Sequence, residues 1–454
     1  MSDLIAAVAT GWVRTGIGIL RLSGGGCIEA AEAVFRAKSG KALRELPPGR
    51  LTLGTLFDEQ ARPIDQCVAV VFRAPHSYTG EDAVEFQCHG SPAVLAAGLR
   101  ALFANGFRQA RAGEFTRRAF LSGQMDLTQA EAVIDLIDAE TPDAAANAAG
   151  QVGGALRRKI EPLYDALCGI CAHFHAVLDY PDEDIDPFQL ENFRKTLEDV
   201  RRSLIALLST CARGRRLKGG VRAAILGSPN VGKSSLLNAL CGYDRVIVTS
   251  IPGTTRDTVE ESVTLGRHLL RLLDTAGIRD TDDTVERLGV TRAEHAAQEA
   301  ELALLVCDGS RPLNEEDERA IRAALSAPRA IALLNKSDLP QCVQPSDLPF
   351  DLVVPISAKN GTGLDLLEQA LDLAFPHESA PCDGGILTNA RQSGALVRAG
   401  KAIDCVLSSM DAGMTPDAVL LDVESAMQAL GEVTGRVVRE DITNEIFSRF
   451  CVGK

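Results

Sequence analysis

The chain has 454 residues, of which 46% are hydrophobic but only 4% aromatic, and its formal net charge is −14. This length exceeds what one hydrophobic core supports, so roughly two to four domains are expected. The acidic balance excludes a protein that binds nucleic acid over its whole surface, because phosphate groups require clustered Lys and Arg. Local RNA contacts stay open at two basic segments, 213–218 and 111–118, for which solvated surface charge is an equal alternative.

The 12 cysteines are scattered along the chain and fit the reduced thiols that are usual in the cytosol. The first residues lack a basic segment, and no apolar run reaches the ~18 residues that cross a membrane. We therefore expect a cytoplasmic protein with no membrane attachment.

Residues 1–121 predict an N-terminal α+β domain. Short β-like runs at 17–20, 68–72 and 84–87 alternate with helical stretches at 27–37 and 92–104.

From residue 122 the pattern becomes helical and continues to 218. Leu127, Ala130 and Ile134 recur at helical spacing, and Asp126 is placed to cap that helix. The acidic segment 179–186 predicts a solvated turn between helices.

A different period begins at 221. The buried-strand run 221–226 leads into a glycine-rich loop, and further core strands are expected at 269–274, 302–306 and 330–334. Together they predict a Ras-like, doubly wound α/β domain over 219–376. A linker at 377–385 follows, and 386–454 is helical again. The α/β domain is thus expected to be inserted into one all-helical domain made of 122–218 and 386–454.

Four motifs of guanine-nucleotide-binding proteins follow one another inside this α/β domain. They are Gly-Ser-Pro-Asn-Val-Gly-Lys-Ser at 227–234, Asp-Thr-Ala-Gly at 274–277, Asn-Lys-Ser-Asp at 335–338 and Ser-Ala-Lys at 357–359. One glycine-rich loop is a weak signal, whereas four motifs in order at this spacing indicate GTP as the ligand.

Each motif has a chemical task. Lys233 is expected to reach the β and γ phosphates, and the Ser234 hydroxyl to ligate Mg²⁺. The Asp338 carboxylate can accept two hydrogen bonds from guanine, which adenine cannot donate. Asn335 is expected to brace the loop that carries Asp338, and Lys336 is expected to lie along the guanine base.

Two further segments are expected to sense the γ-phosphate: the loop that contains Thr254 and Thr255, and the loop with Asp274 and Gly277. The complete predicted GTP-binding set is Asn230, Val231, Gly232, Lys233, Ser234, Ser235, Thr249, Ser250, Ile251, Pro252, Gly253, Thr254, Thr255, Asp274, Thr275, Ala276, Gly277, Asn335, Lys336, Asp338, Ser357, Ala358 and Lys359.

The residue after the Asp-Thr-Ala-Gly motif is Ile278, where Ras-like enzymes carry a glutamine that orients water. Because isoleucine cannot do this, another group must, and Glu286, a little further along the chain, is the natural candidate. Its alternative is an ordinary surface helix residue.

Cys168, Cys171 and His175 share one helical face and could in principle hold a metal ion. The segment is otherwise apolar and has no second cysteine pair, so packing in a core is the favoured interpretation.

Several segments outside the nucleotide motifs resemble the MnmE/TrmE family of tRNA-modification GTPases. They are Gly-Ile-Leu-Arg-Leu-Ser-Gly at 18–24, Tyr-Thr-Gly-Glu-Asp at 78–82, the run 111–120, the run 126–132 and Phe-Cys-Val-Gly-Lys at 450–454. The resemblance covers the whole chain. It implies an N-terminal domain that dimerises and binds a folate, with Arg21, Glu81, Gln124 and Lys454 at the folate positions. Gln124 departs from the family, which usually has lysine there.

The resemblance also implies a potassium ion in the nucleotide site, with Asn230, Thr249, Ile251 and Thr254 as ligands. Ser234 and Thr255 match the Mg²⁺ ligands, Glu286 matches a glutamate that acts through water, and Cys451 matches the cysteine of the family's C-terminal motif. A monovalent cation between the β and γ phosphates would supply the charge that an arginine supplies elsewhere.

The activity that the resemblance implies is potassium-stimulated GTP hydrolysis by a cytoplasmic homodimer. With an FAD- and NADH-using partner (MnmG/GidA) in a heterotetramer, it would install an aminomethyl or carboxymethylaminomethyl group on carbon 5 of the wobble uridine, position 34, of certain tRNAs. The one-carbon unit would come from 5,10-methylene-tetrahydrofolate, of which 5-formyl-tetrahydrofolate is an analogue. Two alternatives stay open, a ribosome-assembly GTPase and a GTP-dependent folate enzyme acting on a small metabolite.

Overall fold

The computed structural model describes residues 3–179, 190–243, 261–273, 295, 297–376, 382–437 and 440–453. The chain divides into two compact units. The first unit comprises Met1–Ile134, Gln151–Arg201 and Gly394–Lys454, and the second comprises Asp135–Gly150 and Arg202–Ser393. Among the described helices, none is long and apolar enough to span a membrane.

The first unit contains a sheet whose strands run in the order β3-β4-β5-β6-β2-β1-β7. The strands are β1 (Ile5–Val8), β2 (Thr15–Ser23), β3 (Phe35–Ala37), β4 (Thr52–Phe57), β5 (Pro63–Phe72), β6 (Ala83–Gly90) and β7 (Arg108–Gln109). All neighbours are antiparallel except β1 and β7. The expected helix at 27–37 is wrong in its last part. Helix α1 (Cys27–Ala31) ends early, because Phe35, Arg36 and Ala37 pair with β4.

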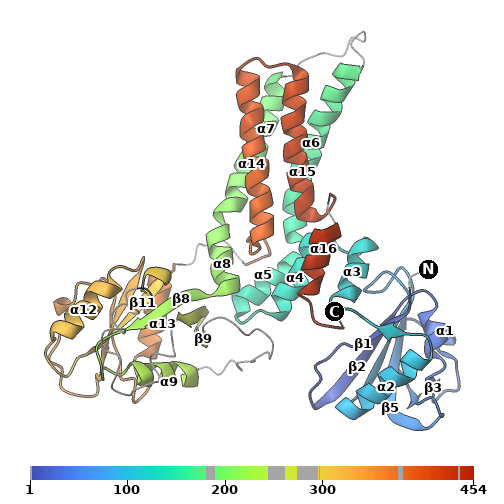
Figure 1. Cartoon of the computed structure of the whole chain (residues 1–454), viewed down its shortest axis with the longest axis horizontal. Coiled ribbons are helices and arrows are strands. Elements are labelled where there is room, and N and C mark those ends of the chain that lie inside the picture. Colours follow the sequence, from blue (N-terminus) through green and yellow to red (C-terminus); the bar gives the residue numbers. More distant parts are fainter. Residues whose placement is uncertain are drawn as a thin grey trace. The chain divides into compact units, whose positions relative to one another are not determined.

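Helix α2 (Pro92–Ala104) lies against this sheet, as Figure 1 shows. The contact is close at two glycines. A Cβ on Gly18 of β2 would lie 2.8 Å from Leu95 Cδ1, and one on Gly98 of α2 would lie 2.5 Å from Leu20 Cδ1. A larger residue at either position would therefore require a leucine side chain of the facing element to move.

The remaining helices of the first unit are α3 (Glu114–Leu121), most of α4 (Leu127–Ile137), α6 (Ala155–Asp179), α15 (Pro416–Thr434), α16 (Glu440–Ser448) and parts of α7 (Leu190–Ser209) and α14 (Ala390–Asp411). Figure 1 shows α6, α7, α14 and α15 running side by side. Ion pairs join them: Arg201 Nε lies 2.6 Å from Asp404, and His175 Nε2 lies 3.0 Å from Glu424.

Asp126 caps α4 as expected. Its carboxylate accepts a hydrogen bond from the Gln129 backbone N–H at 2.9 Å, and the Gln129 side chain accepts one from the Asp126 N–H at 3.0 Å. This reciprocal pair is a capping box.

The expected packing of Cys168, Cys171 and His175 in a core is right only for Cys171, which is buried. Cys168 is exposed, and His175 is 53% exposed and pairs with Glu424, so the core interpretation is wrong for these two residues. Within the described ranges, no group of three or more His, Cys, Asp and Glu side chains is arranged to hold a metal ion.

The second unit contains a sheet in the order β13-β12-β11-β8-β10-β9. Its strands are β8 (Val221–Leu226), β9 (Glu261–Leu265), β10 (His268–Leu273), β11 (Leu302–Asp308), β12 (Ala330–Asn335) and β13 (Val353–Pro355), and only β9 is antiparallel to its neighbour. Its helices include α5 (Pro142–Val152) for the most part, α8 (Cys211–Gly219), α9 (Lys233–Tyr243), α12 (Glu315–Ala324) and α13 (Leu364–Ala374).

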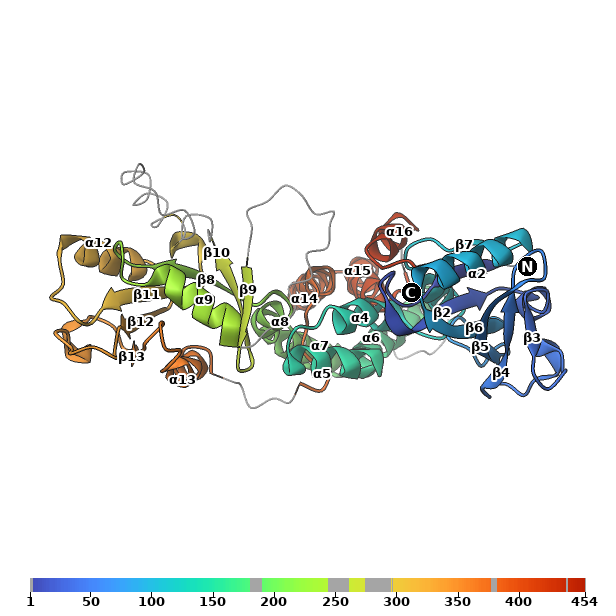
Figure 2. The same ribbon diagram turned by 90° about the horizontal axis from the view of Figure 1, so that it is seen from below.

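Alternate residues of β8 supply two separate cores, one on each face of this sheet. Ala223 and Ile225 join a cluster with α9 and α13, whereas Ala224 and Leu226 join a cluster with α12. Figure 2 shows α12 and α13 on opposite sides of the strands. A mostly parallel sheet with both faces covered is the doubly wound fold that the sequence predicted.

Candidate functional site

The phosphate loop joins the end of β8 to the start of α9. Three of its residues have positive φ angles: 151° at Gly227, 58° at Asn230 and 102° at Gly232. A Cβ on Gly227 would lie 2.4 Å from the Val306 carbonyl oxygen, and one on Gly232 would lie 2.2 Å from Asn335 Nδ2. Glycine is therefore required at both positions by conformation and by space. The loop's fully buried Val231 anchors it to the core.

Lys233 is folded back over the phosphate loop. Its Nζ donates hydrogen bonds to the carbonyl oxygens of Gly227 and Ser228, both at 2.8 Å. Burial lowers the pKa of Lys233. The ammonium group thus lies where α9 begins, at the positive end of a helix, which is an arrangement suited to phosphate oxygens. Ser234 and Ser235 occupy the same first turn.

Asn335 joins three loops. Its Nδ2 donates to the Val231 carbonyl at 2.7 Å, and its Oδ1 accepts from the Ala358 N–H at 2.9 Å. The side chain is 3% exposed, so both bonds are made in a buried setting. Asn335 therefore braces the loop as predicted and also fixes the phosphate loop and the 357–359 loop relative to each other.

Asp338 and Lys336 occupy the edge of this assembly. Asp338 accepts a hydrogen bond from the Ser357 hydroxyl at 2.6 Å, and this bond lowers the pKa of Asp338. The carboxylate is therefore an acceptor at neutral pH, as recognition of guanine N–H groups requires. Lys336 has a φ of 64°, and its Nζ lies 2.5 Å from Asp308 Oδ2.

Part of the predicted site lies outside the described residues. This applies to residues 249–255 and 274–277, and to Ile278, Glu286 and Lys454. Of the predicted metal ligands, Asn230 and Ser234 are described, and Thr249, Ile251, Thr254 and Thr255 are not.

A second candidate site is a cavity of about 120 Å³ in the first unit. Its lining residues are Arg21, Leu22, Phe72, Tyr78, Thr79, Ala83, Glu85 and Phe115. Arg21 Nε donates to Glu85 Oε1 at 2.7 Å, and its Nη1 donates to the Gly453 carbonyl at 3.3 Å. The same guanidinium lies 5.7 Å from the ring centre of Tyr78 and 5.8 Å from that of Phe115. A fixed cation beside the partly exposed Tyr78 ring suits the binding of a flat, polar ligand.

Glu85 is a cavity residue that sequence reasoning missed. Glu85 is identified by the β2–β6 register, which places it directly opposite Arg21. The chain's last described residues complete this region. Val452 pairs with Ala112, and a Cβ on Gly453 would lie 2.2 Å from the Val8 carbonyl.

Glu81 lies next to the cavity without lining it. Its carboxylate accepts from the Ser23 hydroxyl at 2.8 Å and from Arg118 at 3.0 Å. Gln124 donates to the Pro75 carbonyl at 3.2 Å, on the loop that leads to Glu81. The Cys451 side chain is exposed, and its backbone carbonyl accepts from Gly113.

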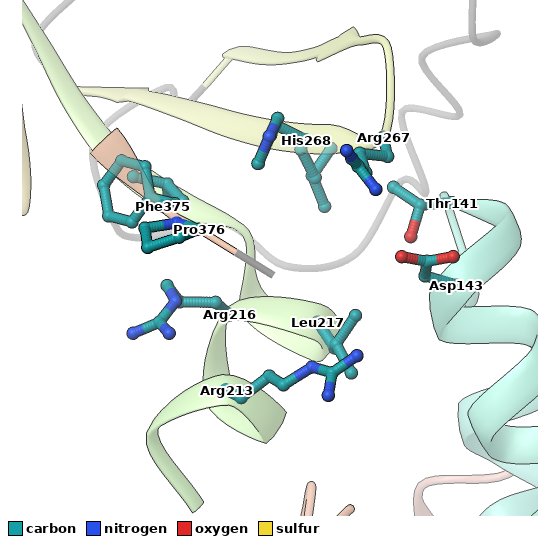
Figure 3. A pocket seen from close by; sticks show the side chains of 11 residues that line it. Thr141, Asp143, Arg213, Arg216, Leu217, Arg267, His268, Phe375 and Pro376 are labelled. Atoms are coloured by element: carbon teal, nitrogen blue, oxygen red, sulfur yellow. The ribbon is translucent and has the colours of Figure 1, made fainter. Parts of the chain in front are cut away.

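The basic segment 213–218 lines a small pocket of the second unit, shown in Figure 3. The pocket is lined by Thr141, Asp143, Arg213, Arg216, Leu217, Val221, Arg267, His268, Leu269, Phe375 and Pro376. Arg267 and His268 both bond to Asp372, at 3.0 and 2.8 Å, and Arg216 lies 5.8 Å from the Phe375 ring centre. Within the basic segment, Arg216 therefore contacts an aromatic ring of the same unit, and an RNA contact by this segment stays a prediction.

The fold and the loops at the carboxyl ends of β8 and β12 define a P-loop protein of the guanine-nucleotide-binding class. Comparisons with known proteins agree. The family model "GTP-binding protein TrmE N-terminus" matches residues 4–124, and the family model "MnmE helical domain" matches residues 127–451.

The curated relatives named "tRNA modification GTPase MnmE" match over the whole chain. The protein from Geobacillus kaustophilus is 42% identical over 459 residues, covering 100% of this chain and 99% of the relative. That from Thermus thermophilus is 43% identical over 455 residues, covering 100% of both. The chain therefore belongs to the MnmE family of tRNA modification GTPases. Among solved structures, a variant of Era from Aquifex aeolicus bound to GDP and aluminium fluoride is 28% identical, covers 40% of this chain and 66% of that chain, and has a TM-score of 0.26.

Proposed function

We propose that this protein is a potassium-stimulated, Mg²⁺-dependent GTPase that acts in the modification of tRNA wobble uridines. The observation that carries GTP binding is the junction at Asn335, which bonds to the phosphate loop and to the 357–359 loop. With Lys233 over the loop and an ionised Asp338 at its edge, phosphate and guanine would each meet a complementary group.

Asn230 and Ser234, the two proposed cation ligands that the structure describes, both carry an oxygen donor that suits the cations of this proposal. Ser234 stands in the first turn of α9 and would hold Mg²⁺ together with Thr255. Asn230, whose side chain is exposed in a left-handed turn of the loop, would hold K⁺ together with Thr249, Ile251 and Thr254. Amide, hydroxyl and carbonyl oxygens are the donors that hard cations prefer. When bound, the cations would neutralise charge that develops on the phosphates. Glu286 would orient the attacking water, the task that Ile278 cannot perform.

We place folate binding at the cavity around Arg21. Tyr78, which is 39% exposed, offers its ring to a pterin, and Arg21 and Glu85 offer charged groups to its polar edge. Glu81, Gln124 and Lys454 would complete the site, and Cys451 would serve one-carbon chemistry. The donor would be 5,10-methylene-tetrahydrofolate, and FAD and NADH would belong to the MnmG/GidA partner.

We further propose a cytoplasmic homodimer that forms a heterotetramer with this partner. Trp12, Val13 and Ile17 support the dimer, because they are 55%, 63% and 59% exposed on one loop-and-strand segment. Clustered exposed apolar side chains usually mark an interface.

The proposed domains are the N-terminal domain 1–121, the helical domain made of 122–218 and 386–454, and the GTPase domain 219–376, which is followed by a linker at 377–385. Of that linker, residues 377–381 lie outside the described part of the chain.

The test is GTP hydrolysis by the purified full chain in potassium and in sodium at equal ionic strength, over a range of protein concentrations. The proposal predicts a large potassium-specific gain that grows with protein concentration. Equal rates in the two salts would contradict cation-assisted activation and would favour a conventional switch with an external activator, such as a ribosome-assembly GTPase.

A further inference from the structure

A buried carboxylate in the second unit is directed at the phosphate loop. Asp317 is 1% exposed, and its Oδ1 lies 2.5 Å from the hydroxyl of Ser228, which is itself 4% exposed. Ser228 is the second residue of the glycine-rich loop, directly after Gly227. No nucleotide motif includes Asp317, which lies 89 residues further along the chain.

Arg311 completes a closed triangle with these two side chains. Its Nη1 donates to Asp317 Oδ2 at 2.7 Å, and its Nη2 donates to Asp317 Oδ1 and to the Ser228 hydroxyl, both at 3.2 Å. The Asn314 backbone N–H also donates to Asp317 Oδ2, at 3.0 Å, and ties the carboxylate to the start of α12. Buried charges are stable when paired and fully hydrogen-bonded in this way.

The charge of Asp317 is maintained by these bonds. Burial acts to raise the pKa of Asp317, but the hydrogen bonds from Arg311, Ser228 and Asn314 outweigh it and lower the pKa below its usual range. The carboxylate is therefore ionised at neutral pH and is a strong acceptor for the loop hydroxyl.

The triangle connects to both nucleotide-contacting parts of the site. The Ser228 carbonyl accepts one of the two hydrogen bonds that hold Lys233, so the position of Ser228 influences where the ammonium group lies. On the other side, Arg311 lies 3.9 Å from Asp308, and Asp308 pairs with Lys336 of the base-recognition motif.

We propose that Asp317 is a positioning residue for nucleotide binding: together with Arg311 it holds Ser228, and thereby the phosphate loop, in the conformation that receives the phosphates. This inference rests on the proposed GTP-binding function and adds a residue to it. A helix-capping role alone would require the bond with Asn314, but would not require a buried carboxylate oxygen directed at the loop.

The test compares Asp317→Asn, Ser228→Ala and the double variant in the full chain, with GDP and a non-hydrolysable GTP analogue as probes. Loss of one charge-assisted hydrogen bond to the loop should raise the dissociation constant of both nucleotides by roughly 10-fold. The KM for GTP should rise by a similar factor, whereas kcat at saturation should change by less than about threefold. The double variant should bind no more weakly than Asp317→Asn, because both changes remove one shared contact.

Glu315→Gln is the matched control, since this side chain is 90% exposed in the same helical turn and should leave affinity unchanged. Unfolding midpoints measured without nucleotide show whether Asp317→Asn folds as well as the wild type. If it does not, Ser228→Ala still tests the proposal, because it removes the same contact from the side of the loop. Wild-type affinity in both single variants, or additive losses in the double variant, would overturn the positioning role. Failure of the wild-type chain to bind GDP or the analogue would instead overturn the proposed function.

Discussion

The nucleotide site and the N-terminal cavity are constructed in opposite ways. The nucleotide site consists of short continuous loops whose shape is set by backbone conformation, as at Gly227 and Gly232. The cavity consists of single side chains from separate strands and loops, and its central pair, Arg21 and Glu85, meets only through the β2–β6 register.

The difference follows from the chemistry of the two proposed ligands. Phosphates are bound by consecutive backbone N–H groups, so their site is encoded as a continuous motif. A ring system with polar edges is bound by side chains that converge from several elements. A continuous site should therefore tolerate few changes within its motifs, whereas a convergent site should lose affinity in smaller steps. The four predictions below test this contrast.

The largest effect is expected from Asp338→Asn in the base-recognition loop. Two hydrogen bonds to a charged acceptor are lost, so GTP affinity should fall by roughly 10²–10⁴-fold, and preference should move to xanthosine triphosphate. Competition binding with the two nucleotides measures this, with Asp365→Asn on α13 as the control. Continued preference for GTP would show that Asp338 does not read the base.

Glu286→Ala should separate hydrolysis from binding in the same site. Turnover should fall by about 10²-fold, a typical contribution of a positioned acid–base group, while the affinity for a GTP analogue stays near that of wild type. Single-turnover hydrolysis and equilibrium binding provide the two readouts. If turnover is unchanged, Glu286 has no part in the mechanism.

For the cavity, Arg21→Ala should weaken binding of 5-formyl-tetrahydrofolate by roughly 10-fold to 100-fold without changing GDP affinity. Glu85→Gln should produce a smaller loss, because it removes the partner that holds Arg21 at 2.7 Å. Titration calorimetry measures both, and Arg62→Ala is the control, since that side chain is 73% exposed in the turn between β4 and β5. Folate affinity that survives both changes would place the ligand elsewhere.

The smallest effect concerns the stability of the first unit in acid. Burial acts to raise the pKa of Glu114, but hydrogen bonds from Arg108, the Arg111 N–H and Arg118 outweigh it and lower the pKa to about 2 from an ordinary 4.5. Because the pKa of Glu114 is lower in the folded state than in the unfolded state, the ionised carboxylate stabilises the fold at pH values above the unfolded-state pKa. This stabilisation is lost as the pH falls towards the folded-state pKa.

Thermal unfolding midpoints measured between about pH 6 and pH 3 should therefore decline more steeply for the wild type than for Glu114→Gln. Parallel declines would show that Glu114 is not a source of acid sensitivity. Because Arg118 also bonds to Glu81, the same variant tests whether this network supports the proposed folate site.

The sequence alone determined the features that depend on local backbone chemistry. The glycine-rich loop, the order of the nucleotide motifs, the buried strands of the second unit and the capping box at Asp126 are all set by residues close together in the chain. Hydrophobic periodicity and turn chemistry depend on residues that are close in the chain, so these patterns can be recognised from the sequence before the structure is known.

Only the tertiary structure decided which distant side chains meet. Strand pairing with β4 turned residues 35–37 from the expected helix into a strand, and sheet register placed Glu85 opposite Arg21. The same holds for Asp317, whose pairing with Ser228 joins residues 89 positions apart. Such contacts depend on the packing of whole elements, so no spacing in the sequence predicts them.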